Sequence, residues 1–290
     1  DQARLVTNNM TVVRKASTEL VQAEAVTVDD IVGLHAALLP GEPRHHGLRT
    51  VQNWVGGSAW HPIDADFVPP RPDLVPGQMQ DLVDYLNGAA HSPLVQAALV
   101  HAQFETIHPF TDGNGRTGRA LIHAMLRGHG LTRKVTVPVS AGLLADTQAY
   151  FDTLTAYREG DPAPIVAKLA NASFAAVANG RLLVSDLNRI REAWNDKLVA
   201  RRGSAARRLA DVLLRQPVID AAVVADELGT SVAGALRPIR PLVEAGVLTE
   251  FTGFKRNRMW QSREVLSALD DFAARAGRRN LDWCPHHCRR

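Results

Sequence analysis

The stretch from His108 to Arg119 reads HPFTDGNGRTGR and combines residue types that suit phosphate chemistry. Gly113 and Gly115 permit backbone conformations that turn successive N–H groups inward, and a helix that begins there adds its positive dipole end. Together these features form a cradle for an anion, and phosphate is its natural guest. The pattern therefore indicates the activation of a hydroxyl group against a phosphorus atom.

The polar side chains of the same stretch extend this hypothesis. His108, with an ordinary pKa of about 6.5, can take a proton near neutral pH. Asp112 offers one hard oxygen ligand, which suits Mg²⁺ because that ion shares its coordination with water and substrate phosphates. Asn114 can donate its amide to a phosphoryl oxygen. Arg116 and Arg119, three residues apart at the head of a helix, can fork onto further phosphate oxygens, so a polyphosphate fits better than a single phosphate.

The elements that must position these residues are helices. Residues 94–105 place apolar side chains at helical spacing after Pro93, and this helix leads the chain into the loop. A second helix is expected to begin within residues 113–116 and to end at Gly128 or Gly130. Phe110 is the loop's one apolar anchor. Glycine-rich loops also serve as plain tight turns, so the loop by itself leaves catalysis and a structural turn open.

Composition limits the class of protein. The 290 residues include only two cysteines, Cys284 and Cys288, so the fold cannot depend on a disulfide framework, and a reducing cytoplasm fits. No apolar run reaches the roughly 18 residues of a membrane span, so no membrane association is expected. Residues 1–180 hold 13 Lys and Arg against 17 Asp and Glu, whereas residues 181–290 hold 20 against 13. A basic second half could meet nucleic acid, although basic solvated surfaces are common.

The chain resembles a known family on several segments. His108 through Arg119 match the Fic signature H-P-F-x-D/E-G-N-G-R-x-x-R at every fixed position. Three further segments are similar to their family counterparts: HAQFETIHPF before the loop, GLRTVQNWVGG at 47–57 and ADFVPPRP at 65–72. The resemblance covers about residues 1–180 and implies a mainly α, Fic-type helical bundle with a short β-hairpin flap. It also implies transfer of AMP from Mg·ATP to a hydroxyl side chain of a target protein, with release of pyrophosphate.

The resemblance also implies roles for the loop residues. His108 would deprotonate the target Ser, Thr or Tyr, and Asp112 would hold Mg²⁺ against the α- and β-phosphates. Asn114 and the N–H groups around Gly113 and Gly115 would stabilise charge that develops at the α-phosphate. The two arginines would then grip the leaving pyrophosphate; they are Arg116 and Arg119.

The resemblance places two further regions at the site. A flap would hold an extended target segment by strand-like pairing, through Trp60, Asp66, Phe67 and Val68. Tyr150 lies in the family's nucleotide-base region, but aromatic residues at helical spacing are more often core, so both roles stay open. Asp146 and Thr147 stand where the family often has Asn or Arg, which leaves the preference for adenine open.

Many relatives restrain themselves with an inhibitory helix of pattern S/T-x-x-x-E-G/N. Residues 1–50 contain no match, and the sequence begins at Asp1 rather than Met, so we expect its natural N-terminus to be missing. Residues 155–160, TAYREG, match formally. We expect a helix end there instead, because so loose a pattern recurs by accident.

The second half of the chain is expected to form a separate module. The boundaries predicted are a Fic catalytic domain over 1–180, a linker helix over 181–204, a winged helix-turn-helix domain over 205–272 and a tail over 273–290. Within the winged domain, helices are expected at 206–215 and 221–228. The linker helix follows from apolar spacing between Leu183 and Leu198.

The winged module has features for and against DNA binding. Its wing tip is basic and could contact phosphates through Lys255, Arg256 and Arg258. Against this, Pro238 and Pro241 fall where a recognition helix should run, and an interior proline costs about 3 kcal/mol. We therefore expect a short or broken helix and a protein-docking or dimer-forming module rather than a reader of DNA sequence. The tail CPHHC cannot surround one metal ion with four ligands.

Two functions remain after these observations. The first is an enzyme that transfers AMP to protein hydroxyls, with Mg²⁺ as cofactor and ATP and a target protein as partners. The alternative is a DNA-binding regulator that uses the loop as a nucleotide sensor. His108 favours the enzyme, because a sensor needs the phosphate cradle but no general base. A related loop can also present other phosphate-bearing nucleotides or choline esters, so the donor stays open.

Overall fold

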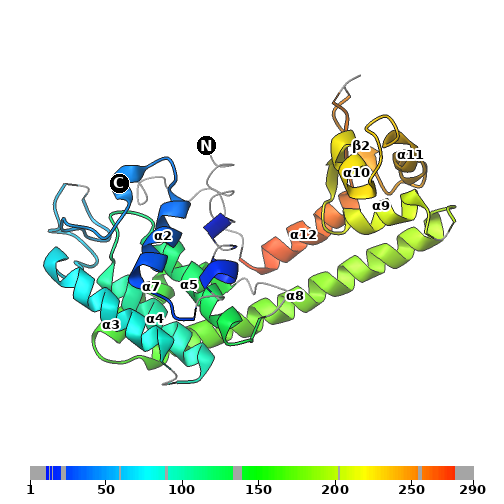
Figure 1. The fold of residues 1–290 in the computed structure, drawn as a ribbon. Coiled ribbons are helices and arrows are strands. Elements are labelled where there is room, and N and C mark those ends of the chain that lie inside the picture. The colour runs from blue at the N-terminus through cyan, green and yellow to red at the C-terminus, as the bar shows by residue number, and fades with distance from the viewer. Residues whose placement is uncertain are drawn as a thin grey trace. The chain divides into compact units, whose positions relative to one another are not determined.

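The structure is a computed structural model of the 290-residue chain, and it describes residues 11–12, 14, 16–20, 24–58, 60–88, 91–132, 139–201, 203–253 and 257–277. The chain divides into two compact units, one reaching to Ala176 and the other covering Val177–Arg278 (Figure 1). Most described residues lie in helices, as the sequence predicts. No helix among these residues is long and apolar enough to cross a membrane.

The first unit is built from helices. Its described residues include short irregular helices, the π-helix η1 (Ala16–Leu20) and the 3₁₀ helices η2 (Pro43–His45) and η3 (Pro72–Leu74). The α-helices are α2 (Val28–Leu38), α3 (Val75–Asn87), α4 (Pro93–Ile107), α5 (Asn114–Gly128), α6 (Val139–Leu144), α7 (Thr147–Arg158) and the first half of α8 (Ala163–Lys197).

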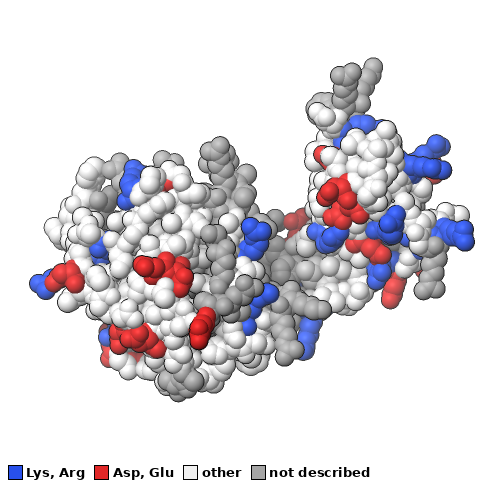
Figure 2. Space-filling view, in the orientation of Figure 1, with Lys and Arg blue, Asp and Glu red and all other residues white. Residues whose placement is uncertain are grey.

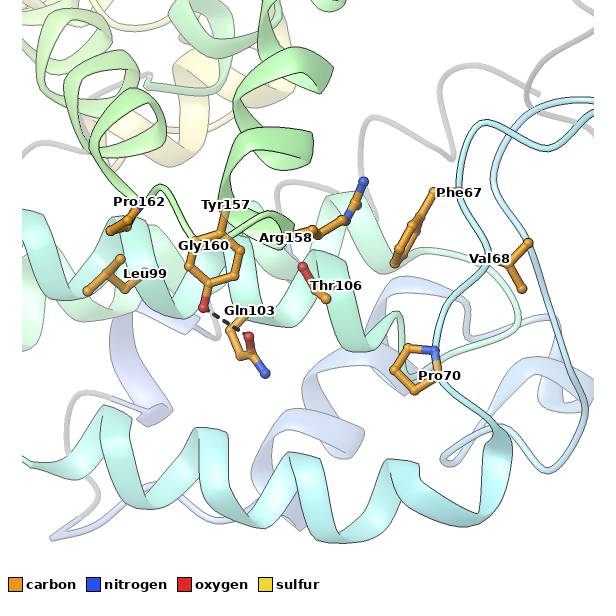
Figure 3. Close-up of a pocket in the computed structure, with 10 residues that line it drawn as sticks. All are labelled: Phe67, Val68, Pro70, Leu99, Gln103, Thr106, Tyr157, Arg158, Gly160 and Pro162. Atoms are coloured by element: carbon orange, nitrogen blue, oxygen red, sulfur yellow. Dashed lines mark hydrogen bonds between the residues drawn. The ribbon is translucent and has the colours of Figure 1, made fainter.

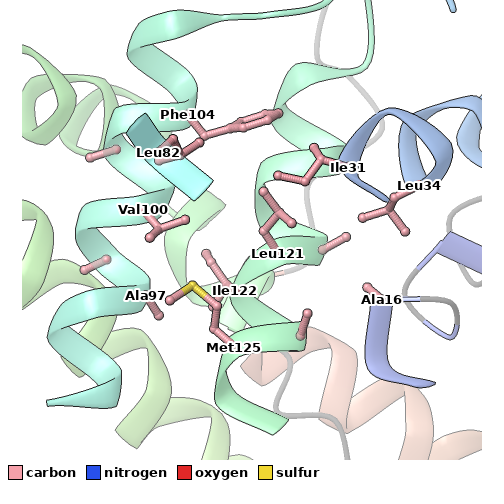
Figure 4. Close-up of a cluster of buried hydrophobic side chains, with 14 of the residues drawn as sticks. Ala16, Ile31, Leu34, Leu82, Ala97, Val100, Phe104, Leu121, Ile122 and Met125 are labelled. Atoms are coloured by element: carbon pink, nitrogen blue, oxygen red, sulfur yellow. The ribbon is translucent and has the colours of Figure 1, made fainter. Parts of the chain in front are cut away.

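The core of the first unit lies between α4 and α5, with α2, α3 and η1 packed around them (Figure 4). Burial of each large aliphatic or aromatic side chain contributes about 1.5–3 kcal/mol relative to exposure, so this cluster fixes both helices. The side chains that meet there include Ala97, Val100 and Phe104 from α4 and Leu121, Ile122 and Met125 from α5. Both helices occur where the periodicity predicts them, and both lead directly into the glycine-rich loop.

Gly118 sets the close approach of α4 and α5. A Cβ atom on Gly118 would lie 2.7 Å from Oε1 of Glu105 and 3.0 Å from Cδ1 of Phe104, which is tighter than most real Cβ contacts. Any larger residue at this position would therefore force these buried side chains to shift. The consequence is that the first two turns of α5 lie directly against the last turns of α4, which carry the chain into the loop.

The second unit consists of the rest of α8, four further helices and a small sheet. The helices are α9 (Ala205–Leu213), α10 (Ala221–Leu228), α11 (Leu236–Glu244) and α12 (Arg263–Arg275). Strands β1 (Val218–Asp220), β3 (Met259–Gln261) and β2 (Thr249–Glu250) form an antiparallel sheet in that spatial order, with Ile219 paired to Trp260. The core includes Leu209, Leu213, Ile239, Leu242 and Trp260. The helices predicted at 206–215 and 221–228 are present within a residue or two.

Helix α11 is short, as expected, but it is not broken. It runs continuously over Leu236–Glu244 with Pro241 inside it. Pro238 is the third residue of the helix, where a missing N–H costs little because the first-turn donors have no intrahelical partner. Pro241 removes one further bond, and burial of Ile239 and Leu242 in the core offsets that loss. The assignment of the whole module as a winged helix-turn-helix stays a prediction.

Helix α8 differs from the sequence-based boundaries. The expected linker helix at 181–204 is not a separate element, because residues 181–197 are the second half of the 35-residue α8. The expected tail from residue 273 begins inside α12, which continues to Arg275. Lys255, Arg256 and the cysteines of the tail lie outside the described residues. The face shown in Figure 2 carries several Lys and Arg side chains on the second unit, in line with its basic composition.

Candidate active site

The glycine-rich loop joins two helix ends whose backbones are both left-handed. His108 follows the last residue of α4 with φ 49° and ψ 60°, and Gly113 precedes α5 with φ 79°. A left-handed conformation costs a residue with a Cβ about 1–2 kcal/mol. Among the described residues, only His108 and Asn257 combine a side chain with a positive φ. The chain therefore holds His108 in a strained conformation, which is typical of functional positions.

Arg49 holds the loop in place through hydrogen bonds to its backbone. Its side chain is 3% exposed. Its Nε donates to the carbonyl oxygen of His108 at 2.9 Å, and its backbone N–H donates to that of Pro109 at 2.8 Å. The guanidinium also donates to backbone carbonyls of Val51, Pro70 and Ile107. One buried cation thus fixes the backbone on both sides of the imidazole.

Asn114 closes the loop on itself. Its Oδ1 accepts the N–H of Phe110 at 2.9 Å, and its Nδ2 donates to the carbonyl of Phe110 at 2.8 Å. The side chain is 2% exposed, so the amide is not available to a phosphoryl oxygen in this arrangement. The role predicted for the Asn114 side chain is corrected to that of a loop lock. Asn53 assists by donating its Nδ2 to the same carbonyl at 2.9 Å.

Phe110 is the core anchor that the sequence predicts, and it is fully buried. Its ring stacks on His35 with centroids 3.8 Å apart and planes 9° apart. Nε2 of His35 lies 2.8 Å from the backbone oxygen of Asp112, where the N–H tautomer donates a hydrogen bond. Burial lowers the pKa of His35, which keeps the ring neutral for this contact. The sequence offered no signal for this role, since His35 lies more than 70 residues before the loop.

His108 lies at the mouth of the loop and is half-buried. Burial lowers its pKa to about 4, and the positive charges of Arg49 and Arg158 act in the same direction. The backbone of Glu105 and the carboxylate of Asp112 oppose this shift. The expectation of an ordinary pKa of about 6.5 is therefore wrong. At neutral pH the imidazole is uncharged and able to accept a proton, although it is a weaker base than free imidazole.

The first turn of α5 has open backbone donors. No side chain caps this helix, and the N–H groups of Asn114, Gly115 and Arg116 make no hydrogen bond with any residue in the described part of the chain. Thr117 donates the first helical bond, to the carbonyl of Gly113 at 3.0 Å. Free N–H groups and the positive end of the helix dipole both favour an anion at this point. The cradle expected from the glycines is thus present in the backbone.

Asp112 and Arg116 pair with each other across the cradle. Nη2 of Arg116 lies 3.3 Å from Oδ2 of Asp112, and Oδ1 of Asp112 accepts the N–H of Gly113 at 2.6 Å. The Asp112 side chain is 45% exposed, so a cation could still reach it. Within the described residues, no three His, Cys, Asp or Glu side chains cluster to hold a metal. A metal here would therefore depend on one carboxylate plus ligands from a bound molecule.

Arg119 lies beside the open turn of α5. A Cβ on Gly115 would lie 3.0 Å from its Nη1, which places the guanidinium against the cradle. No hydrogen bond or ion pair joins it to another described residue, but its charge acts on buried Glu105. Burial raises the pKa of Glu105 to about 7, so this carboxyl is about half protonated near neutrality and neutralises Arg119 only in part.

Tyr150 is part of the core rather than of an open site. It is 4% exposed, and its hydroxyl lies 2.8 Å from Nε2 of His101. Burial raises its pKa well above the usual value, and burial lowers that of His101 to about 3. Of the two roles left open for Tyr150, the structure supports core packing, and the proposed contact with a nucleotide base is withdrawn for this side chain.

The flap segment folds back on itself at Val55 and Phe67. Val55 and Phe67 form a single antiparallel bridge, with the N–H of Val55 donating to the carbonyl of Phe67 at 2.9 Å. No regular strand occurs among the described residues of this segment, so a hairpin flap stays a prediction. The predicted docking residues divide into Trp60, Asp66 and Val68, which are exposed, and Phe67, which is half-buried under the guanidinium of Arg158.

Residues 155–160 and His45 complete the description of the site. Residues 155–160 form the end of α7 and its C-cap, with Glu159 exposed, so the structure supports a helix end there. His45 contacts the loop as well, because its Nδ1 lies 2.7 Å from the hydroxyl oxygen of Thr111. Its Nε2 also lies 3.4 Å from Oε2 of Glu42. His45 thus joins the residues that fix the loop.

Comparison with known proteins matches the segment that carries this site to one family model. Residues 25–126, which include α2, α4, the loop and most of α5, match the model of the Fic/DOC family. The chain is 34% identical over 158 residues to "Protein adenylyltransferase fic-1" of Caenorhabditis briggsae, covering 52% of this chain and 28% of that protein. It is 32% identical over 162 residues to "Protein adenylyltransferase Fic" of Nematostella vectensis, covering 54% and 34% respectively.

These curated relatives are longer proteins, and the chain spans about a third or less of their length. Among solved structures, Fic-1 (residues 134–508) from C. elegans matches with 29% identity and a TM-score of 0.46. That match covers 59% of this chain and 48% of that chain.

Proposed function

We propose that this chain is a protein adenylyltransferase, which transfers AMP from Mg·ATP to a hydroxyl side chain of a target protein. The observation that carries the proposal is a single loop that begins with His108 at the end of α4 and ends at the uncapped N-terminus of α5. This arrangement pairs a proton acceptor with an anion cradle in one loop. The match of residues 25–126 to the Fic/DOC family and the names of the curated relatives support it.

In the proposed reaction, the target oxygen forms a bond to the α-phosphorus while the bond to the bridging oxygen of the β-phosphate breaks. The hydroxyl proton passes to His108, and pyrophosphate leaves. His108 is uncharged before the reaction because burial lowers its pKa to about 4. A bound triphosphate raises that pKa by its negative charge, so the imidazole becomes a better base only when the nucleotide is present.

The free N–H groups of Asn114, Gly115 and Arg116 are the proposed oxyanion donors. Backbone donors are held rigidly by the loop locks, so they need no reorganisation as charge develops on the α-phosphate. Asn114 then contributes through its backbone, while its side chain keeps the loop closed. Gly115 leaves room for a phosphate to approach these donors, because a larger side chain would meet Arg119.

The two arginines and Asp112 are proposed to bind the polyphosphate. Arg119 lies beside the cradle with no ion-pair partner among the described residues, so its donors suit the β- and γ-phosphates. Asp112 fits Mg²⁺ as a single exposed ligand, provided that the phosphates supply the others and Arg116 turns from Asp112 to the phosphates. When bound, Mg²⁺ neutralises the charge of the phosphates.

Incubation with ATP labelled at the α-phosphate tests the proposal. The protein should label itself or an added protein, and His108→Ala should lower the rate by about 10²–10⁴-fold, the usual contribution of a general base. The control is His129→Ala, since His129 caps the far end of α5. Absence of label on protein in a cell extract, or equal labelling by His108→Ala, would reject the enzyme.

A further inference from the structure

Helix α2 reaches the glycine-rich loop through one buried histidine. The groove in Figure 3 is lined by the flap, by α4 and by the end of α7 with the residues that follow, and none of its lining residues comes from α2. His35 lies in the last turn of α2 and is fully buried. A buried imidazole carries two polar atoms, so its hydrogen bonds show why a histidine rather than an apolar residue occupies this position.

Helix α2 holds His35 in a defined position. Thr27 and Asp30 form a capping box at the start of the helix, in which each side chain accepts the backbone N–H of the other residue. Ile31 and Leu38, four residues before and three residues after His35, are buried in the core of the first unit. These three residues lie on one face of α2, so the packing of the helix also places the imidazole.

The hydrogen bond of His35 determines which of its nitrogens carries the proton. Nε2 lies 2.8 Å from the carbonyl oxygen of Asp112. A carbonyl oxygen only accepts hydrogen bonds, so Nε2 must be the protonated nitrogen. Nδ1 is buried and has no hydrogen-bond partner among the described residues. The bond to Asp112 is therefore the one hydrogen bond that the ring makes within the described part of the chain.

One peptide group connects His35 to the carboxylate of Asp112. The carbonyl of Asp112 and the N–H of Gly113 belong to the same planar peptide group. That N–H donates to Oδ1 of Asp112 at 2.6 Å. A hydrogen bond to the carbonyl polarises the peptide group and strengthens the donor at its other end. His35 is thus one end of a chain of two hydrogen bonds, and the carboxylate of Asp112 is the other end.

Gly113 makes the orientation of this peptide group depend on α2. Its φ of 79° lies in the left-handed region, where glycine has more conformational freedom than other residues. A Cβ atom on Gly113 would lie 3.2 Å from Nε2 of His35 and 3.1 Å from Cδ2 of Leu38, so α2 lies directly against the glycine. The loop therefore combines a permissive residue with a contact from another helix that fixes its conformation.

We propose that His35 is a positioning residue, which orients the carboxylate of Asp112 as a metal ligand. The part of Asp112 as a ligand rests on the proposed function, whereas its orientation by His35 does not. An ion held by a single protein carboxylate depends on the position of that carboxylate, because no second protein ligand compensates for its movement.

Arg116 gives this orientation a consequence. Its Nη2 lies 3.3 Å from Oδ2 of Asp112, while Oδ1 of the same carboxylate accepts the N–H of Gly113. Without the hydrogen bond from His35, the peptide group can turn and Oδ1 loses its donor. The carboxylate is then free to turn both oxygens to Arg116, and an ion pair replaces the metal ligand.

Packing alone does not explain a histidine at this position. The ring of His35 stacks on that of Phe110 with centroids 3.8 Å apart. The substitution His35→Phe keeps a ring that can stack but removes the donor. The substitution His35→Gln removes the ring but keeps an N–H donor at the end of its side chain. A positioning role requires the donor, whereas a packing role requires the ring, so these two variants distinguish the roles.

Hydrogen exchange of the Gly113 amide tests the positioning without any nucleotide. The full chain is labelled with ¹⁵N, and exchange is followed by NMR. We expect exchange about tenfold faster in His35→Phe, because the peptide group has lost its outer hydrogen bond, and a rate near that of the wild type in His35→Gln. His123→Phe is the matched control and should leave the rate unchanged, because His123 is a buried histidine that makes no hydrogen bond with a described residue.

Calorimetric titration with ATP tests the consequence for the metal. The affinity is measured once with Mg²⁺ and once with EDTA, and the ratio of the two affinities gives the contribution of the metal. His35→Phe should lower this ratio about tenfold while the affinity in EDTA stays unchanged, because the phosphate donors of α5 are intact. His35→Gln should keep most of the ratio, and Asp112→Asn should lower it at least as much as His35→Phe.

Three outcomes overturn the proposal: unchanged exchange of the Gly113 amide in His35→Phe, an effect in His35→Gln that is larger than in His35→Phe, and an equal effect in His123→Phe. If His35→Phe does not unfold cooperatively in urea, His35→Met, which also lacks a donor, takes its place. Exchange that responds as expected in a chain that binds no ATP rejects the adenylyltransferase alone. A ratio that His35→Phe leaves unchanged, in a chain that transfers label to protein, rejects the positioning role alone.

Discussion

The phosphate loop and the flap lie in the same unit but are held in opposite ways. The loop is fixed by side chains that reach it from distant parts of the chain, including Arg49, Asn53 and His35. The flap is joined mainly by backbone hydrogen bonds between Val55 and residues 66–67, and Trp60 and Ile63 are 79% and 82% exposed. The difference teaches that the residues proposed for bond making are rigid, while those proposed for target docking can adapt to different partners.

Among the variants considered, replacement of Arg49 should lower the free energy of unfolding the most. Arg49→Ala leaves the backbone carbonyls of His108 and its neighbours without their donors and opens a buried space. We expect a loss of about 3–5 kcal/mol in the free energy of unfolding, measured by urea denaturation. Arg71→Ala, an exposed arginine, should change it by less than about 0.5 kcal/mol. Similar losses for both variants would show that the hydrogen bonds of Arg49 do not stabilise the loop.

Acid should lower the stability of the fold through buried histidines in and around the loop, none of which lies in the flap. Burial lowers the pKa values of His101, His108 and His123 to about 3, 4 and 4, so the unfolded chain binds these protons first as pH falls below 6.5. Glu105 acts in the opposite direction, because its raised pKa of about 7 lets the folded chain bind a proton first as the pH falls toward the ordinary value. It is one group, whereas three histidines act the other way. Stability should therefore fall on acidification from pH 6.5 to 4.5, on the order of 2 kcal/mol per pH unit.

Urea midpoints at pH 7, 6 and 5 measure this slope. Replacement of His123 by Gln should flatten it by about one proton, that is by about 1.4 kcal/mol per pH unit. A stability that stays constant over this range would mean that these imidazoles are not buried in the neutral form.

Arg119 tests whether the rigid loop binds the phosphates. Arg119→Ala should weaken ATP binding about tenfold in calorimetry, because a charge-assisted contact to a phosphate is lost. Arg127→Ala is the matched control, since Arg127 lies in the last turn of the same helix. Unchanged ATP affinity in Arg119→Ala would remove this residue from the proposed site.

The smallest effect is expected in the flap. Ile63→Ser should change the free energy of unfolding by less than about 0.5 kcal/mol, because Ile63 is almost fully exposed. The same variant should raise the KM for a protein target while it leaves the KM for ATP unchanged. The core control Ile122→Ala should cost about 2–5 kcal/mol. A large loss of stability in Ile63→Ser would show that the flap is packed more firmly than its exposure indicates.

The sequence predicted the parts of the site that depend on local chemistry. The two glycines and the helix periodicity were sufficient to predict α4, α5 and the uncapped first turn of α5. Backbone freedom and apolar spacing are local properties of the sequence. The direction of the Asn114 amide could not be predicted, since a side chain of this length reaches either the loop or a ligand. In the structure the Asn114 side chain is buried and bonded to the loop.

Residues that act from a distance were missed for a related reason. His35 and Arg49 are separated from the loop by 59 residues or more, and nothing in their own neighbourhoods marks them. Tyr150 is a different case, because its position in the chain left a ligand contact and core packing both open, and its hydrogen bond to His101 and its burial support core packing. The length of α8 was underestimated because its first half lacks the strong apolar spacing that marks residues 183–198.

The guanidinium of Arg49 is bonded both to the backbone beside the imidazole and to the carbonyl of Pro70, where the flap ends. In the proposed reaction, a target bound at the flap would therefore act on the same guanidinium that holds the backbone of His108. Binding of the target and the position of the proposed base would then be coupled through this one side chain.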